Sequence, residues 1–299
     1  TKSFVSITSY EELKKLVKDI NCNRFLFHAF DKKTITLINY INASKKIWIC
    51  GGIEIYEYIN SIRYNNYETK TLNLHLYLNS KLKYIINKLF LNNYPLLVKP
   101  LAYKTDVQYL EYLKMFDYFA SFFKEESQIL KEKLGLYIPW VPYLYYSINS
   151  ASDETLNHKA NNRPYLMVGN SASAANNHIE AFIILKNRLN EKQKILSPLT
   201  YGNKGYRDKV ITYGYKYFNE DFHPLKKHLE LDEYIKFLMK SKALIFNHRR
   251  QQGFGNIVLA LFYGAKIYLN KENPIYNTLI NKGFYVFDFR KLDGDAVEL

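Results

Sequence analysis

The sequence is poor in cysteine, proline and glycine, and it has no long apolar run. Its 299 residues include 2 cysteines, 8 prolines and 12 glycines. Cys22 and Cys50 lie in apolar surroundings without metal-site spacing, which argues against a disulfide scaffold and suits a reducing cytoplasm. No apolar run reaches the roughly 18 to 20 residues that span a bilayer. The chain begins at Thr1 rather than Met, so we expect part of the native N-terminus to be missing and read no targeting signal from this end.

Acidic residues are also scarce, and the chain has a net charge of +14. Such a charge alone fits nucleic acid, an anionic membrane surface or a phosphorylated substrate. Residues 1–150 hold 20 basic and 13 acidic side chains, and residues 151–299 hold 22 and 15. Because this excess is spread evenly, we expect no nucleic-acid partner. We expect instead a protein that works near anionic lipid or a diphosphate.

Strand and helix patterns alternate along the whole chain, which predicts parallel sheets with helices on their faces. Residues 147–163 lose this periodicity and are the predicted linker. We therefore predict an α/β protein with two Rossmann-like, doubly wound domains, residues 1–150 and 164–299, and a ligand cleft between them. The expected strands are 4–7, 24–30, 46–50, 70–78, 98–102, 137–141, 165–168, 194–199, 216–218, 243–246, 265–269 and 285–287. The expected helices are 9–20, 32–41, one from residue 54, 107–134 (with a break allowed), 176–189, 204–214, 232–240, 256–263 and 274–282.

A polar, glycine-containing turn between strand 243–246 and the apolar helix that follows is the most informative segment. A turn that opens a helix offers unpaired N–H groups and a positive dipole end, which suit a phosphate. Arg250 adds a planar fork that can hold two phosphate oxygens. The alternative is a solvated loop whose glycines only cap and turn. The predicted binding residues here are Asn247, Arg250, Gln251, Gln252, Gly253, Gly255 and Asn256.

A second turn of the same kind follows strand 165–168. Gly169, Asn170 and Ser171 would let a ligand approach the backbone closely, and a helix begins a few residues later. His178 lies in the first turn of that helix, where an imidazole can donate to a phosphate or a sugar hydroxyl. Alternatively, the Asn and Ser residues only cap the helix and His178 is a surface residue. Two such turns at the carboxyl ends of strands of one sheet favour a diphosphate ligand.

The order and spacing of several motifs resemble the TDP-4-acetamido-4,6-dideoxygalactose (TDP-Fuc4NAc) transferases, a 4-alpha-L-fucosyltransferase-like family. Its members act on a lipid-linked acceptor in enterobacterial common antigen and related polysaccharide synthesis. The resemblance is dense over residues 165–290 and weaker over the first domain, at Trp48, Gly52–Tyr56 and 116–139. The motifs are Gly169-Asn170-Ser171, Asn177-His178, Pro198-Leu199-x-Tyr201-Gly202, Leu231-Asp232-Glu233-Tyr234, Asn247-x-x-Arg250-Gln251-Gln252-x-x-Gly255-Asn256 and Asn273-Pro274.

The resemblance implies a GT-B glycosyltransferase with the nucleotide sugar in the second domain and the acceptor in the first. It implies no cofactor and no metal, because the turns and Arg250 can stabilise the diphosphate leaving group. Glu272 and Asn273 follow a strand end and could also reach the donor. Tyr201 could stack on the base or ribose, or it is simply one of 28 tyrosines. The enzyme is expected in the cytoplasm, peripheral on the inner face of the bacterial plasma membrane.

One departure from related folds concerns the mechanism. Many retaining enzymes of this fold carry paired glutamates where this chain has Gln252 and Ala260, so their mechanism does not transfer. If the reaction inverts, a general base should come from the first domain. Glu54 is the first candidate and His28 the second. The alternatives are a helix-capping carboxylate and a packed histidine.

The acceptor side gives a weaker signal. Residues 81–99 interleave lysines with large apolar side chains, which suits an anionic membrane but also an ordinary amphipathic helix. Other functions are a GT-B enzyme with a different donor, a non-catalytic nucleotide-sugar binder, or a nucleic-acid-binding protein.

Overall fold

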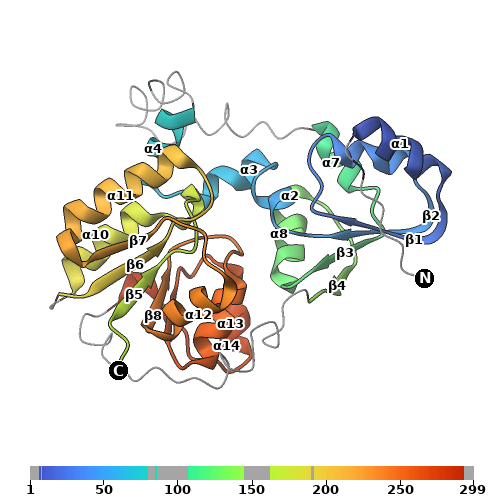
Figure 1. The fold of residues 1–299 in the computed structure, drawn as a ribbon. Coiled ribbons are helices and arrows are strands. Elements are labelled where there is room, and N and C mark those ends of the chain that lie inside the picture. The colour runs from blue at the N-terminus through green and yellow to red at the C-terminus, as the bar shows by residue number, and fades with distance from the viewer. Residues whose placement is uncertain are drawn as a thin grey trace. The chain divides into compact units, whose positions relative to one another are not determined.

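The computed structural model describes residues 7, 9–79, 85, 107–144, 162–189 and 192–292, and the chain forms two compact units (Figure 1). The first unit comprises Thr1–Arg63 and Ala102–Leu144, and the second comprises Tyr64–Leu101 and Tyr145–Leu299. This division differs from the predicted one, because residues 64–79 belong with the second unit. The predicted strands 4–7 (except Ile7) and 98–102, the segment 81–99 except Ile85, and residues 147–161 of the linker lie outside the described residues.

The first unit is built on a parallel four-stranded sheet of order β1-β2-β3-β4. Trp48 is fully buried at the centre of an aromatic cluster with Phe30, Phe116 and Phe119. Ser9 caps the first helix as expected, because its side chain accepts from the Glu12 N–H at 3.2 Å. The elements are α1 (Tyr10–Asp19), β1 (Asn21–His28), η1 (Thr34–Tyr40), β2 (Asn42–Ile49), α2 (Ile53–Tyr56), α3 (Asn60–Arg63), α7 (Val107–Leu113), β3 (Tyr118–Ser121), α8 (Lys124–Leu134) and β4 (Trp140–Pro142).

The second unit is built on a parallel six-stranded sheet of order β10-β9-β8-β5-β6-β7. Numbered within the unit, this is the doubly wound order of dinucleotide-binding folds, in which the winding reverses between β5 and β8. The elements are η2 (Tyr64–Asn66), α4 (Thr69–Asn79), β5 (Tyr165–Val168), η4 (Ala174–Asn176), α10 (His178–Arg188), β6 (Lys194–Pro198), α11 (Lys204–Phe218), η5 (Asn219–Asp221), β7 (Phe222–Leu225), α12 (Leu231–Met239), β8 (Ser241–Phe246), α13 (Phe254–Phe262), β9 (Lys266–Leu269), α14 (Pro274–Asn281), β10 (Phe287–Asp288) and η6 (Phe289–Lys291).

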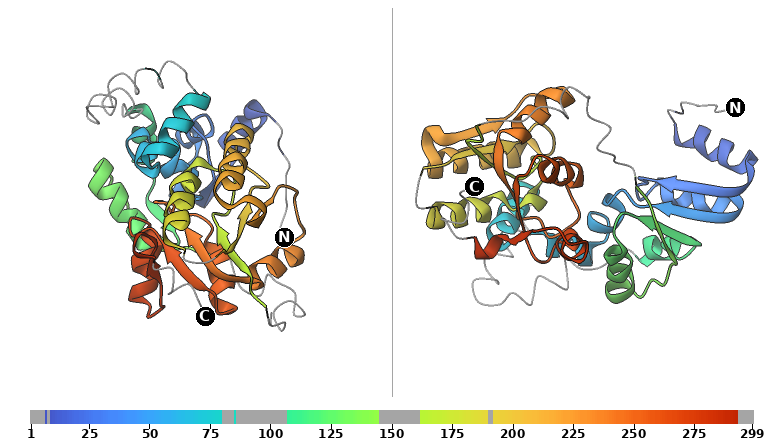
Figure 2. Two further views of the ribbon diagram at one scale, coloured as in Figure 1. Left: turned by 90° about the vertical axis from the view of Figure 1, so that its left-hand side faces the viewer. Right: turned by 90° about the horizontal axis from the view of Figure 1, so that it is seen from below.

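Helices of the second unit form two packed groups (Figures 1 and 2). In one group α4 contacts α10 and α11, and in the other α12 contacts α13, which packs on β8 and β9. The carboxyl ends of β5 and β8 are adjacent, since Val168 pairs with Ile245. Ligands of doubly wound sheets bind at this switch point, and both predicted turns leave the sheet there.

Two predicted elements of the chain, both strands, are wrong. Residues 70–78 alternate leucines with polar residues like a strand, but they form α4. Leu72, Leu74 and Leu78 pack against the core, so tertiary contacts override the period. Residues 216–218 continue α11 past Gly214, because that glycine lets the Phe222 ring lie against the helix backbone; a Cβ there would come within 2.4 Å of the ring. The predicted helix 107–134 does have the allowed break and forms α7 and α8, but strand β3 within that break was not predicted.

Candidate functional site

The first predicted turn follows β5 and is held by one asparagine side chain. Gly169 has φ +70°, a conformation that suits glycine. The Asn176 amide accepts from the Asn170 N–H at 3.2 Å and donates to the Ser171 carbonyl at 3.0 Å. It also donates to Ser171 Oγ at 3.2 Å. These bonds fix the backbone of Asn170 and Ser171, and the Ser171 hydroxyl, at the carboxyl edge of the sheet.

The second predicted turn, after β8, meets the first one directly. Gln252 Nε2 donates to Asn170 Oδ1 at 2.7 Å and to Ser171 Oγ at 3.2 Å. Gly253 is the N-cap of α13 with φ +64°, so its neighbours Phe254 and Gly255 open a helix at this edge. The structure therefore brings together residues of the two turns that are 82 positions apart in the sequence.

The N-cap residue of α14 holds the loop that carries Arg250 through hydrogen bonds to the loop backbone. Asn273 Nδ2 donates to the Arg250 carbonyl at 3.0 Å and to the His248 carbonyl at 3.1 Å. The same side chain caps α14 by accepting from the Ile275 N–H. Asn273 is fully buried, so its observed contacts are a cap and a brace for the arginine turn. Glu272 instead pairs with Arg249, with 3.3 Å between Oε2 and Nε.

Tyrosines border this edge. Asn170 Nδ2 donates to the Tyr201 hydroxyl at 3.2 Å, and Tyr201 is 61% exposed. Asn256 Nδ2 donates to the Tyr234 hydroxyl at 2.9 Å. Gly202 approaches the Ala172 backbone so closely that a Cβ would lie 2.6 Å from it, which joins the turn after β6 to the turn after β5.

His178 lies behind the first turn and is not a surface donor. It is fully buried, and burial lowers its pKa to about 3, so the ring is neutral at physiological pH. Its Nδ1 lies 3.3 Å from the Tyr206 hydroxyl. A Cβ on Gly169 would come within 2.4 Å of His178 Nε2, so the ring packs against the turn itself. The alternative of a surface residue is therefore wrong, and the contact between His178 and a ligand stays a prediction.

Asparagine side chains connect the strand ends of the second unit. Buried Asn177 has φ +51°, and its Nδ2 donates to the Asn247 carbonyl at 3.0 Å and to the Asn66 carbonyl at 2.9 Å. Its Oδ1 accepts from the Glu68 N–H at 2.8 Å. Asn270 Nδ2 donates to Asn247 Oδ1 at 3.0 Å. The start of α10 and the ends of β8 and β9 are thereby joined.

Several residues of this arrangement were missed by sequence reasoning. Glu68, Asn177, Asn270 and His248 were not named as site residues. Burial lowers the His248 pKa to about 3, and the Arg250 charge lowers it further. Asn177 carried a usable signal, because asparagine before a helix tolerates the left-handed conformation. Glu68 carried none, because its partner Asn177 is 109 residues away.

The carboxyl edge of the first unit holds acidic groups instead of amides. Glu54 is fully buried, its Oε1 accepts from the Gly51 N–H at 3.2 Å, and burial raises its pKa. Glu126 is also buried and accepts from the Tyr56 hydroxyl at 3.2 Å. Burial raises the Glu126 pKa to about 7, and the Glu54 charge adds to this rise. His28 is exposed at the end of β1 and interacts electrostatically with Glu54. Both predicted bases, His28 and Glu54, therefore lie at the carboxyl edge of the four-stranded sheet, where His28 is exposed and Glu54 is buried.

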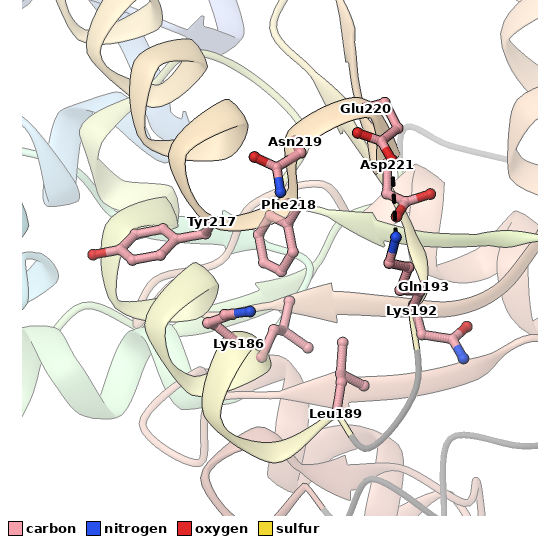
Figure 3. A pocket seen from close by; sticks show the side chains of 10 residues that line it. Lys186, Leu189, Lys192, Gln193, Tyr217, Phe218, Asn219, Glu220 and Asp221 are labelled. Atoms are coloured by element: carbon pink, nitrogen blue, oxygen red, sulfur yellow. Dashed lines mark ion pairs between the residues drawn. The ribbon is translucent and has the colours of Figure 1, made fainter.

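Other features of the described residues lie away from these turns. A hollow of about 200 Å³ between the C-terminal ends of α10 and α11 is at the amino edge of the six-stranded sheet, where Lys192 and Glu220 lie 3.9 Å apart (Figure 3). Within the described ranges, no three His, Cys, Asp or Glu side chains are grouped as metal ligands. None of the helices described there is long and apolar enough to cross a membrane.

The fold is that of GT-B glycosyltransferases. A structure of the E. coli trehalose-6-phosphate synthase bound with UDP-2-fluoro glucose matches with a TM-score of 0.56 and 12% identity, covering 96% of this chain and 68% of that one. A UDP-forming α,α-trehalose-phosphate synthase from Burkholderia xenovorans matches with a TM-score of 0.56 and 10% identity over 96% and 66%. A sucrose-phosphate synthase from Thermosynechococcus elongatus matches with a TM-score of 0.54 and 10% identity, covering 88% of this chain and 60% of that one. The chain thus spans about two thirds of the length of these proteins.

Sequence comparison defines the family within that fold. The model of the 4-alpha-L-fucosyltransferase family, glycosyl transferase group 56, matches residues 141–298, which is more than half of the chain. The chain belongs to this family and is a nucleotide-sugar-dependent glycosyltransferase. The predicted family resemblance, fold class and enzyme class are confirmed.

Proposed function

We propose that this enzyme transfers a 4-acetamido-4,6-dideoxyhexose from a TDP-sugar to a lipid-linked or polysaccharide acceptor. The observation that carries the proposal is the direct contact between the two turns at the switch point, Gln252 to Asn170 at 2.7 Å. Polar groups from both turns converge where doubly wound sheets bind nucleotides. The choice of TDP and of this sugar follows from the family resemblance of the motifs.

Arg250 and the backbone N–H groups of the two turns would stabilise the leaving group. The bond between the sugar C1 and the diphosphate oxygen breaks, and negative charge grows on the diphosphate. Preorganised donors and a cation lower the energy of that charge. We therefore propose a reaction that needs no metal. Asn247, Gln251, Gln252, Asn256 and Asn170 would bind the sugar and the diphosphate.

The acceptor hydroxyl would lose its proton to the first unit if the reaction inverts. His28 is exposed at the end of β1, while Glu54 is fully buried nearby. A buried carboxylate cannot touch an acceptor unless its surroundings move, so His28 becomes the first candidate for the base. Glu54 would then act through electrostatic stabilisation of the protonated imidazole. The pH dependence of transfer by His28→Gln and Glu54→Gln distinguishes the two roles.

A lipid-linked acceptor would bring the enzyme to the inner face of the bacterial plasma membrane. The net charge of +14 favours an anionic surface. Co-sedimentation with vesicles of zwitterionic lipid, with and without anionic lipid, measures this association. Binding that needs anionic lipid and falls with salt supports the proposal, and equal recovery in the supernatant with both vesicles contradicts it.

Melting temperatures measured with TDP, UDP and GDP, each with and without EDTA, test the donor. We expect the largest rise with TDP and no effect of EDTA. A larger rise with UDP or GDP would favour a transferase with another donor. Transfer from TDP-Fuc4NAc to a lipid-linked acceptor then separates an enzyme from a non-catalytic binder. Salt-dependent binding of oligonucleotides without any nucleotide effect would indicate a nucleic-acid-binding protein.

A further inference from the structure

Tyr201, Asn170 and Gln252 form a chain of hydrogen bonds across the edge of the second unit. Gln252 Nε2 donates to Asn170 Oδ1, and Asn170 Nδ2 donates to the Tyr201 hydroxyl. An amide has one donor side and one acceptor side, so the direction of each bond determines the next. With the bonds in the observed direction, the Tyr201 hydroxyl accepts from Asn170, so its own proton points away from the Asn170 and Gln252 amides.

The other end of the chain is an acceptor without a partner. Gln252 is 9% exposed, and its Oε1 is buried with no hydrogen bond from any residue that the structure describes. A buried polar atom left unpaired is costly, and most such atoms in proteins have a partner. Oε1 is covered in this conformation, so a donor reaches it once a neighbouring side chain moves aside. A ligand that supplies that donor removes the cost.

An anion bound beside Tyr201 would favour this direction of the hydrogen bonds. The tyrosine ring is largely exposed, but its hydroxyl end is enclosed, and this burial raises its pKa, opposed by Ser171 and by the Arg250 charge. The phenol therefore keeps its proton and lies near Arg250. A diphosphate held by Arg250 would accept that proton as a hydrogen bond. The reverse direction would turn the phenol oxygen toward the anion, which is repulsive.

We propose that Gln252 Oε1 accepts a hydrogen bond from an N–H or O–H group of the donor sugar while Tyr201 donates to the diphosphate. This inference rests on the proposed function and deepens it. The two amides couple the ends of the ligand, because a diphosphate at Tyr201 requires Gln252 to present its oxygen. A glutamate at position 252 would place a carboxylate oxygen against Asn170 Oδ1, at the 2.7 Å contact that the amide N–H occupies.

Calorimetric titration of the full chain with TDP and with TDP-4-acetamido-4,6-dideoxygalactose tests the proposal. The quantity of interest is the ratio of the Kd for TDP to the Kd for the TDP-sugar, which isolates the contribution of the sugar to binding. Gln252→Met keeps the length of the side chain but has no acceptor of this kind, and we expect the ratio to fall roughly tenfold. Tyr201→Phe should weaken both ligands by a similar factor, roughly fivefold, and leave the ratio unchanged.

Gln252→Glu provides a second variant in case the methionine disturbs folding. Its carboxylate keeps an acceptor for the sugar but should turn the Asn170 amide around and draw the Tyr201 proton inward, so TDP affinity should fall while the ratio is largely kept. Gln193→Met, in the hollow of Figure 3 at the opposite edge of the sheet, should leave both constants unchanged. An unaltered ratio in folded Gln252→Met, or an unaltered affinity for TDP in folded Gln252→Glu, would overturn the inference. Failure of the wild-type protein to bind either ligand would instead refute the proposed function.

Discussion

The carboxyl edges of the two parallel sheets differ in the chemistry of their buried side chains. In the second unit they are mostly amides that bond to one another and to backbone groups, as at Asn177, Asn247 and Asn273, with Glu68 as an acidic exception. In the first unit they are acids whose pKa values are raised by burial, Glu54 and Glu126, beside the Cys50 thiol, whose pKa burial also raises. The strands of both sheets are parallel, but the chemistry of their carboxyl edges differs.

The difference indicates a division of tasks. Amides keep their hydrogen bonds at any physiological pH, so an amide edge holds a ligand in a fixed geometry. Buried acids change protonation near neutral pH, so an acidic edge suits proton transfer. The following predictions test whether the second edge binds an anion, whether the first one titrates, and whether the amide contacts are essential.

The largest effect is expected for Arg250→Ala. Loss of the cation should reduce kcat for transfer by roughly 100-fold or more, because charge on the leaving diphosphate is then less stabilised. The rise in melting temperature caused by TDP should also disappear. Arg250→Lys should recover part of both, since lysine keeps the charge and loses the planar fork.

Arg24→Ala is the matched control, because Arg24 is exposed at the start of β1 and far along the chain from the turns. It should change neither measurement. A TDP-induced rise that persists undiminished in Arg250→Ala would remove the arginine from the site.

Glu126→Gln should change how stability depends on pH. The folded-state pKa of about 7 lies above the ordinary value of 4.5, so the native state binds more protons between these values. Wild-type stability should therefore fall as pH rises from about 4.5 to 7, by at most about 3 kcal/mol. The glutamine variant should lack this fall and be the more stable protein at pH 8.

Urea unfolding from pH 4.5 to 8 measures the difference, with Glu132→Gln as control. Glu132 lies on the same helix, α8, and is exposed. Parallel pH profiles of Glu126→Gln and the wild type would show that this edge does not titrate, and the contrast between the two units would lose its basis.

A smaller effect is expected when one amide hub is removed. Asn177→Gly keeps the left-handed backbone but loses the bonds to Asn66, Asn247 and Glu68, and we expect a loss of about 2 kcal/mol in the free energy of unfolding. Asn219→Gly, at φ +50° on an exposed residue, is the matched control and should cost nothing. Equal stabilities of the two variants would mean that the amide network adds no stability.

How much could be foreseen depended on whether the deciding contact was local. Strand β5, strand β8 and the turns after them follow from short apolar runs ending in glycine and asparagine, and they were predicted closely. Helix α4 was taken for a strand because its leucines alternate, and only packing on α10 and α11 makes it helical. His178 was expected to face a ligand because it lies in the first turn of a helix. Its burial could not be foreseen, because that position does not indicate which way the side chain points.

The sequence by itself determined the βαβ order, the two glycine-containing turns, and the absence of a carboxylate at position 252. These are local properties of apolar period, backbone freedom and side-chain type. Only the tertiary structure decided that Gln252 bonds to Asn170, that His178 is buried and neutral, and that residues 64–79 belong to the second unit. Each of these depends on which distant segments share a core, because burial and hydrogen bonding across long sequence separations leave no pattern in the neighbouring residues.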